Sequence, residues 1–355
     1  MASKVTIQDI ADALGVSRNT VSKAINNTGV LAAATRDRVL KKAQEMGYKQ
    51  FSYLNISEAA GLPAVPEAEK KHEIALFMGN FVGGSHFAST MLDKFQRELA
   101  QLGYSLIMYR VIEEEVEGLQ LPVSFRPEGI AGIACVEIFD HEYCRMLCRL
   151  GLPLLFIDSP ADGFEAPLKA DLLYMDNRTE IYRFVKEMVQ RGKTRIGFVG
   201  PYMHCQSFYE RYMSYRNAMH MMGLPCPEEY CLIEDRHGLL GSAREDYHKY
   251  LAGHIGEMKK LPDVFLCAND ATALDVMQVL DSLGYSVPGD VCLCGFDDSP
   301  ESRVVAPPLT TIHIHSQDIG LSAVQLLISR IKEPSLNYRT VYVETNLIFR
   351  ESTEG

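Results

Sequence analysis

The stretch Thr6–Asn26, TIQDIADALGVSRNTVSKAIN, determines how the chain begins to fold. It predicts two short helices joined by a tight turn at Gly15, because apolar residues recur at helical spacing on either side of that glycine. Thr6 and Ser17 are placed to cap the two helices. The second helix turns apolar side chains inward, and its outward face carries Arg18, Asn19, Ser22 and Lys23. This pattern is typical of a helix-turn-helix, whose second helix enters the major groove of DNA.

A third helix is expected to complete this N-terminal unit. Val39, Ala43 and Met46 form an apolar stripe, and Gly47 ends it. The segment before the stripe offers no hydroxyl cap until Thr35, so a shorter helix starting near Thr35 is predicted.

The charge of the chain is unevenly distributed. The whole chain of 355 residues carries −11. Residues 1–49 hold eight Lys or Arg and four Asp or Glu, a net +4, which leaves −15 for the remainder. A basic head on an acidic body predicts that phosphate contact is confined to the head.

The rest of the chain divides into a linker and a large core. Residues 50–71 lack a hydrophobic period and predict a hinge or linker. Residues 72–355 alternate short apolar runs with amphipathic helices, which predicts an α/β fold with two doubly wound parallel-sheet lobes. The expected strands are Ile74–Met78, Ser105–Tyr109, Ile130–Val136, Leu154–Ile157, Ile196–Val199, Cys231–Ile233, Val264–Cys267 and Val291–Gly295.

The chain resembles the LacI/GalR family of bacterial transcriptional regulators. The resemblance begins at 6–26 and continues at Asp270–Ala273, Gly295–Pro300, Pro307–Ile312 and Phe349–Thr353. It implies an all-α helix-turn-helix domain over 1–49 and a periplasmic-binding-protein-type core, built from two lobes that close over an effector and form a dimer. It also implies that the chain crosses between the lobes near 171–176, 296–301 and 328–338.

The outward face of the second helix is the expected DNA-reading surface. Arginine pairs with guanine and asparagine with adenine, so Arg18 and Asn19 are predicted to touch bases, although both could instead bind only phosphate. The predicted DNA-binding residues are Thr6, Ser17, Arg18, Asn19, Thr20, Ser22, Lys23, Asn26 and Tyr48.

The segment after Tyr48 departs from the family pattern. The family hinge has an Ala-Arg-x-Leu element here, whose leucine wedges into the minor groove. This chain has KQFSYLNIS over residues 49–57. Leu54 or Ile56 is a candidate wedge; the alternative is that DNA bending and allosteric transmission differ from the family norm.

Polar residues just beyond the predicted strands are the candidate effector ligands, because open α/β sheets bind ligands at the carboxyl ends of their strands. Carboxylate, amide and guanidinium groups in such positions suit a sugar-like polyol. The predicted effector-binding residues are Phe81, Phe87, Asp158, Arg211, Arg236, Asn269 and Asp297. Asp297 could instead cap a turn, and Phe87 could belong to the core.

Arg236 occupies the position where the family usually has a stacking aromatic residue. With His237 in the cleft it would favour an effector bearing a carboxylate or phosphate. The alternative is that both lie in a solvated loop.

No enzyme, cofactor or metal site is predicted. Cys144 and Cys148, Cys292 and Cys294, and His313 and His315 are pairs without further ligands at metal-binding spacing. There is no signal-peptide pattern and no long apolar run, so a cytoplasmic protein with reduced thiols and no membrane partner is expected.

The leading hypothesis is a homodimeric, ligand-controlled repressor that binds an operator in double-stranded DNA. A solute-binding protein without operator-specific binding is the main alternative. A DNA-binding architectural protein with an inactive core is a weaker one.

Overall fold

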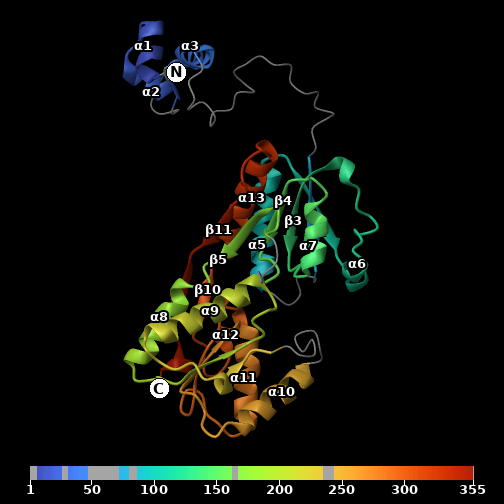
Figure 1. The fold of residues 1–355 in the computed structure, drawn as a ribbon, viewed down its shortest axis with the longest axis vertical. Helices are drawn as coiled ribbons and strands as arrows, with labels where there is room; N and C mark the ends of the chain where they lie inside the picture. Colours follow the sequence, from blue (N-terminus) through green and yellow to red (C-terminus); the bar gives the residue numbers. More distant parts are fainter. Residues whose placement is uncertain are drawn as a thin grey trace. The chain divides into compact units, whose positions relative to one another are not determined.

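The computed structural model describes residues 6–25, 31–46, 72–79, 86–161, 167–234 and 244–354. The chain forms two compact units, Met1–Lys70 and Lys71–Gly355 (Figure 1). The predicted linker 50–71, with its candidate wedges Leu54 and Ile56, lies outside the described residues.

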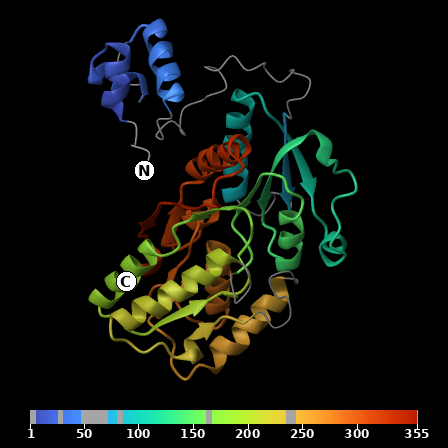
Figure 2. The ribbon, with the colours of Figure 1, turned by 45° about the horizontal axis from the view of Figure 1, so that its top comes forward.

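The first unit contains three helices, α1 (Ile7–Leu14), α2 (Arg18–Ile25) and α3 (Ala33–Glu45), packed as a small bundle (Figure 2). Thr6 caps α1 through a capping box with Asp9, and Gly15 ends it in the left-handed conformation at φ 64°. The bundle core is formed by six buried side chains from all three helices: Ile10, Ala11, Val21, Ala24, Val39 and Ala43.

The start of α3 differs from the prediction. The helix begins at Ala33 rather than near Thr35. The carbonyl of Ala32 accepts hydrogen bonds from the backbone N–H groups of Thr35 and Arg36, which closes the first turn without a hydroxyl cap.

The second unit is a doubly wound α/β structure, as predicted. Its largest sheet has six parallel strands in the order β11-β5-β4-β3-β1-β2. These strands are β1 (Glu73–Met78), β2 (Ser105–Arg110), β3 (Ile130–Val136), β4 (Leu154–Ile157), β5 (Asp171–Met175) and β11 (Thr340–Val343).

A second parallel sheet has four strands in the order β7-β6-β8-β9, and a two-stranded antiparallel sheet pairs β10 with β12. Their bounds are β6 (Ile196–Val199), β7 (Cys231–Leu232), β8 (Val264–Cys267), β9 (Cys292–Cys294), β10 (Thr311–Ile314) and β12 (Thr345–Ile348).

Helices flank these sheets and separate their strands along the chain. They are α5 (His86–Gln101), α6 (Glu113–Glu117), α7 (His141–Cys148), α8 (Thr179–Gln190), α9 (Gln206–Met221), α10 (Arg244–Glu257), α11 (Asp270–Ser282), α12 (Pro300–Val304) and α13 (Ser316–Lys332). The short 3₁₀ helices are η4 (Pro127–Gly129), η5 (Glu228–Tyr230) and η6 (Glu351–Thr353).

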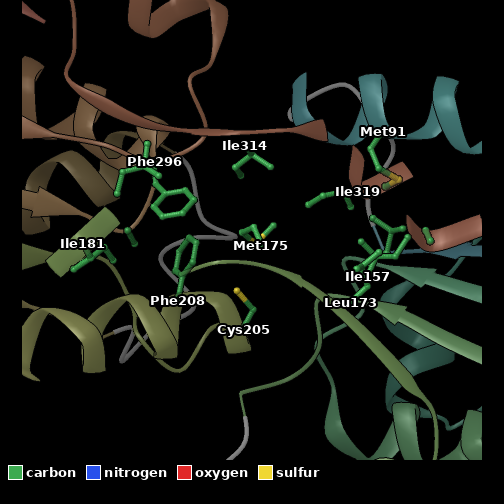
Figure 3. Close-up of a cluster of buried hydrophobic side chains, with 14 of the residues drawn as sticks. Met91, Ile157, Leu173, Met175, Ile181, Cys205, Phe208, Phe296, Ile314 and Ile319 are labelled. Atoms are coloured by element: carbon green, nitrogen blue, oxygen red, sulfur yellow. The ribbon is translucent and has the colours of Figure 1, made fainter. Parts of the chain in front are cut away.

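Both faces of the two parallel sheets are buried. In β1, Ile74 and Leu76 join one hydrophobic cluster with α5 and α13, whereas Ala75 and Phe77 join another with α7. This alternation explains why the strand is a continuous apolar run in the sequence. The first cluster is shared between the sheets: Figure 3 shows it extending from Met91, Ile157 and Leu173 to Phe208 and Phe296.

The chain passes between the six-stranded sheet and the rest of the unit after β5, between β10 and α13, and between β11 and β12. The last two passages differ from the expected segments. Residues 296–301 do not enter the six-stranded sheet: they follow β9, and Asp297 forms a bridge to His313 of β10, as Cys294 does to Thr310. Residues 328–338 end α13 and lead into β11 within the six-stranded sheet.

Within the described ranges, no helix is both long enough and apolar enough to span a membrane.

Candidate functional site

The outward face of α2 is the first candidate site. Val21 and Ala24 are buried in the bundle core, which leaves Arg18 and Asn19 exposed at the start of the helix. Neither side chain forms a hydrogen bond or ion pair with another described residue. Both are therefore available to an external partner.

Two of the other predicted DNA-binding residues have structural roles within the bundle. Ser17 Oγ accepts a hydrogen bond from the Thr20 backbone N at 3.0 Å, and Thr6 Oγ1 accepts one from the Asp9 backbone N at 3.3 Å. Both hydroxyls thus cap helices. Ser22 and Lys23 are half-buried on α2, whereas Asn26 and Tyr48 lie outside the described residues.

The second candidate site is a cavity of 1490 Å³ in the second unit, at the carboxyl ends of strands from both parallel sheets. It is lined by five of the seven predicted effector residues: Phe87, Asp158, Arg211, Asn269 and Asp297. Phe81 and Arg236 lie outside the described residues.

Asp158 follows β4 with a positive φ of 62°. Its Oδ1 accepts hydrogen bonds from the backbone N–H groups of Ser159 at 2.8 Å and Ser207, in the first turn of α9, at 3.2 Å. Burial raises the pKa of Asp158, while these donors and Arg211 oppose the rise. The carboxyl is thus held rigidly at the cavity wall.

Arg211 is the most constrained group of the site, with 3% of its side chain exposed. Its Nε donates to Asn177 Oδ1 at 2.9 Å, and Nη1 donates to the Ala268 carbonyl at 2.6 Å. Its guanidinium lies 3.5 Å from the ring centre of Phe296. Burial lowers the pKa of Arg211, and Asp297 opposes that change. Arg211 therefore supplies a fixed positive charge beside the cavity.

Asp297 lies 3.8 Å from Arg211 Nη1 and has a φ of 117°. Burial raises its pKa to about 8; Arg211 opposes the rise, whereas Asp270 and Glu137 add to it. Among the described residues, its carboxyl makes no hydrogen bond. It is thus available to a ligand, and its predicted alternative as a turn cap gains no support.

Asn269 and Phe87 each line the cavity and also have a structural role. Asn269 Oδ1 caps α11 by accepting from the Thr272 N–H at 2.9 Å, which leaves its amide NH₂ for a ligand. Phe87 lines the cavity and also packs against the shared hydrophobic cluster.

Sequence reasoning missed Glu137, which lines the cavity directly after β3. Its φ is 55°, and burial together with Asp158 raises its pKa. The rule that selected Asp158 and Asp297, a polar residue just past an apolar run, also selects Glu137.

An aromatic wall was also missed. The His204 ring lies 5.0 Å from that of Phe139 and 5.4 Å from that of Phe208, and all three line the cavity. Phe139 is distant from the other two in the sequence, whereas His204 and Phe208 are four residues apart around the start of α9, a spacing that sequence reasoning did not single out.

Among the described residues, no group of three or more His, Cys, Asp or Glu side chains is arranged to hold a metal ion.

Two family models match the chain. The model for bacterial regulatory proteins of the lacI family matches residues 6–50, and that for a periplasmic binding protein-like domain matches residues 185–353. The HTH-type transcriptional repressor PurR of Vibrio parahaemolyticus serotype O3:K6 is 27% identical over 355 residues, 98% of each chain. The PurR of Pasteurella multocida is 26% identical over 358 residues, 99% of each chain.

Solved structures share the fold. A transcriptional regulator CelR–cellobiose complex superposes with a TM-score of 0.68 at 21% identity, covering 98% of this chain and 100% of that one. The Lac repressor dimer bound to operator and the anti-inducer ONPF gives 0.64 at 20% identity, covering 99% of each chain.

The chain combines a helix-turn-helix unit with a second unit whose two parallel sheets border a polar cavity. This combination defines the class of ligand-controlled DNA-binding regulators. The chain belongs to the LacI family of bacterial regulatory proteins.

Proposed function

We propose that this protein represses transcription by binding an operator as a homodimer, and that a small sugar-like effector in the cavity controls this binding. The observation that carries the proposal is the presence, in one chain, of the unpaired Arg18 and Asn19 on α2 and of a cavity lined by polar groups. The effector acts through its different affinities for two arrangements of the lobes of residues 72–355.

Arg18 and Asn19 are proposed to read bases, whereas Thr6, Ser17, Thr20, Ser22, Lys23, Asn26 and Tyr48 position the helix on phosphates. The test is binding of the full chain to labelled DNA from its own promoter. Arg18→Ala should weaken specific binding by about 5- to 150-fold, corresponding to ~1–3 kcal/mol for a bidentate base contact. Lys260→Ala, which alters an exposed residue of the second unit, is the control and should leave affinity unchanged.

The same titration distinguishes base reading from phosphate binding. If Arg18→Ala weakens specific and random DNA equally, Arg18 binds only phosphate. If the wild type shows no sequence-specific binding with or without effector, the protein is instead a solute-binding protein.

The effector is proposed to be a sugar or sugar derivative held by Glu137, Asp158, Arg211, Asn269 and Asp297. The carboxyl groups accept hydrogen bonds from sugar hydroxyls, and the amide of Asn269 donates to them. The rings of Phe139, His204 and Phe208 offer faces on which a sugar can stack. Structures of similar fold contain cellobiose or ribose, which supports this chemical class.

Native mass spectrometry of the purified protein and thermal shifts with a panel of neutral, acidic and amino sugars test the effector. Asp297→Asn should reduce affinity for the sugar that binds, whereas Asp281→Asn, on the exposed surface of α11, should not. Equal affinities for both variants would remove Asp297 from the site.

Arg236 remains a candidate for recognising an acidic group on the effector. An arginine is positively charged at neutral pH and pairs with a carboxylate or a phosphate through two parallel hydrogen bonds. Arg236→Ala should therefore weaken binding of acidic sugars while sparing neutral ones. Unchanged affinity for every acidic sugar would contradict this role.

The protein is further proposed to act in the cytoplasm, where operator DNA is found. Fractionation of cells that produce the full chain tests this: recovery from the membrane or an exported fraction would contradict it.

A further inference from the structure

Two cysteines meet a buried tyrosine at the end of the four-stranded sheet. Tyr215 on α9 donates its hydroxyl proton to the Ile196 carbonyl at 2.7 Å. Cys226 Sγ lies 3.3 Å from the same hydroxyl oxygen, and Cys231 Sγ, at the start of β7, lies 3.9 Å from it. The two thiols therefore converge on one oxygen atom.

The two thiols also affect each other's ionisation. The interaction with Cys231 is the main cause that lowers the pKa of Cys226 to about 6; burial opposes the change, and the positive charge of Arg216 reinforces it. The same interaction, followed by burial, raises the pKa of Cys231. At neutral pH the pair thus holds one thiolate, at Cys226, and one thiol, at Cys231.

The other cysteines provide a contrast. Six are buried: Cys135, Cys144, Cys205, Cys267, Cys292 and Cys294. Cys148 is half-buried like Cys226 and Cys231, but burial raises its pKa. Cys148 is therefore an internal control with similar access and no thiolate.

The segment between the two cysteines favours their contact. Pro227 and the 3₁₀ turn η5 bring the chain back within five residues, so that Cys231 begins β7 beside Cys226. Because the sulfurs lie 3.3 and 3.9 Å from one hydroxyl oxygen, rotation of the two side chains can join them with little displacement of the backbone.

We propose that Cys226 and Cys231 form a peroxide-oxidised thiol pair that is separate from the effector cavity. The Cys226 thiolate attacks one oxygen of a hydroperoxide, the O–O bond breaks, and a proton completes the leaving water or alcohol. Sulfur is oxidised to sulfenic acid while the peroxide is reduced. Cys231 then attacks the sulfenic sulfur, water leaves with the thiol proton, and an intramolecular disulfide remains. A dithiol reductant reverses the change.

Alkylation of the reduced full chain tests the first requirement. With limiting iodoacetamide at pH 7, Cys226 should react on the order of tenfold faster than Cys148, since its thiolate fraction exceeds its loss of nucleophilicity. Peptide mass spectrometry measures both rates in the same wild-type sample, so no variant needs to fold. Equal rates would overturn the proposal.

Hydrogen peroxide tests the second requirement. The wild type should lose two hydrogen atoms from the peptide containing Cys226 and Cys231, and dithiothreitol should restore them. Cys231→Ser should instead accumulate a dimedone-reactive sulfenic acid at Cys226, while Cys148→Ser should behave as wild type. Formation of no 226–231 disulfide in folded wild-type protein, or the same dimedone labelling of Cys148 as of Cys226, would contradict the proposal.

Discussion

At the residue scale, the cavity is notable for acidic side chains in an uncommon backbone conformation. Glu137, Asp158 and Asp297 have φ values of 55°, 62° and 117°. Residues other than glycine seldom adopt a positive φ. Those that do are held in this conformation by the surrounding structure, often at ligand sites. Burial raises the pKa of all three. The site thus holds carboxyls that resist ionisation and that, when protonated, can donate as well as accept hydrogen bonds.

Asp297→Asn should change how stability depends on pH. The folded-state pKa of Asp297, about 8, lies above the ordinary aspartate value of 3.8, so its contribution to stability is fully present below pH 3.8 and is lost as pH rises through 8. Asparagine cannot ionise, so the variant should become more stable relative to the wild type as pH rises between those values. The expected difference in the free energy of unfolding is on the order of 2 kcal/mol, because water in the open cavity screens the charge. Thermal unfolding from pH 5 to 9 measures this.

The matched control is Asp281→Asn, which removes an exposed carboxyl from α11. Its unfolding curve should follow that of the wild type at every pH. Parallel wild-type and Asp297→Asn curves would show that Asp297 ionises as freely in the folded protein as in the unfolded one.

At the scale of elements, a buried carboxylate connects three parts of the six-stranded sheet. Asp171 begins β5 and is fully buried. Arg330 of α13 donates to both its oxygens, at 2.8 and 3.0 Å, and the Arg339 side chain adds a bond at 3.0 Å just before β11. The cluster fixes α13 and β11 against β5, where the chain returns to this sheet.

Asp171→Asn should destabilise the protein by about 3–5 kcal/mol, because Arg330 would remain buried without its counterion. Burial opposes ionisation of Asp171, but the bonds from Arg330 and Arg339 outweigh it and lower its pKa. The stabilisation is therefore present above the unfolded-state pKa and is lost as pH falls through the folded-state value. Urea unfolding at pH 7 and at about pH 2.5, below the ordinary aspartate pKa, should show a smaller wild-type advantage in acid.

Asp93→Asn is the comparison for this experiment, since Asp93 pairs with Arg97 on α5 with both side chains more than half exposed. It should cost at most about 1 kcal/mol. A similarly small effect of Asp171→Asn would show that the buried cluster contributes no more than a surface pair.

The sequence predicted strands where they form continuous apolar runs. Strands β3 and β4 have their predicted bounds, whereas β5 and β10, which are also mostly buried but include polar residues, are not among the expected strands. Strand β11 was missed because it lies at the sheet edge with alternating exposure, so it forms no continuous run. The crossing after β10 was placed too early, since the bridge from Asp297 to His313 depends on long-range pairing that local sequence does not encode.

Part of the candidate cavity was predictable, because several of its residues directly follow strands that the sequence identifies. Strand ends can be identified along the sequence, and Asp158, Asn269 and Asp297 follow them. The packing of Arg211 on Phe296 and its bond to Asn177 join segments distant in the chain. Such contacts arise only from the tertiary fold.

At the scale of the whole molecule, charge separates the two functions. Residues 1–49 carry +4 and the remainder −15. DNA attracts the first segment and repels the second, so nonspecific association should also use the helix-turn-helix unit. Ionic strength then becomes a means of testing which unit binds DNA.

Replacing Lys23 with glutamine should therefore change the salt dependence of DNA binding. If Lys23 neutralises one phosphate, the plot of log affinity against log salt concentration should become shallower by about 0.9. Lys260→Gln removes the same charge from the acidic second unit and should leave the slope unchanged, because DNA does not approach that surface. Fluorescence anisotropy with a random duplex at several potassium chloride concentrations measures both slopes. An equal decrease for the two variants would mean that DNA contact extends beyond the head, and that the −15 charge of the body does not confine it.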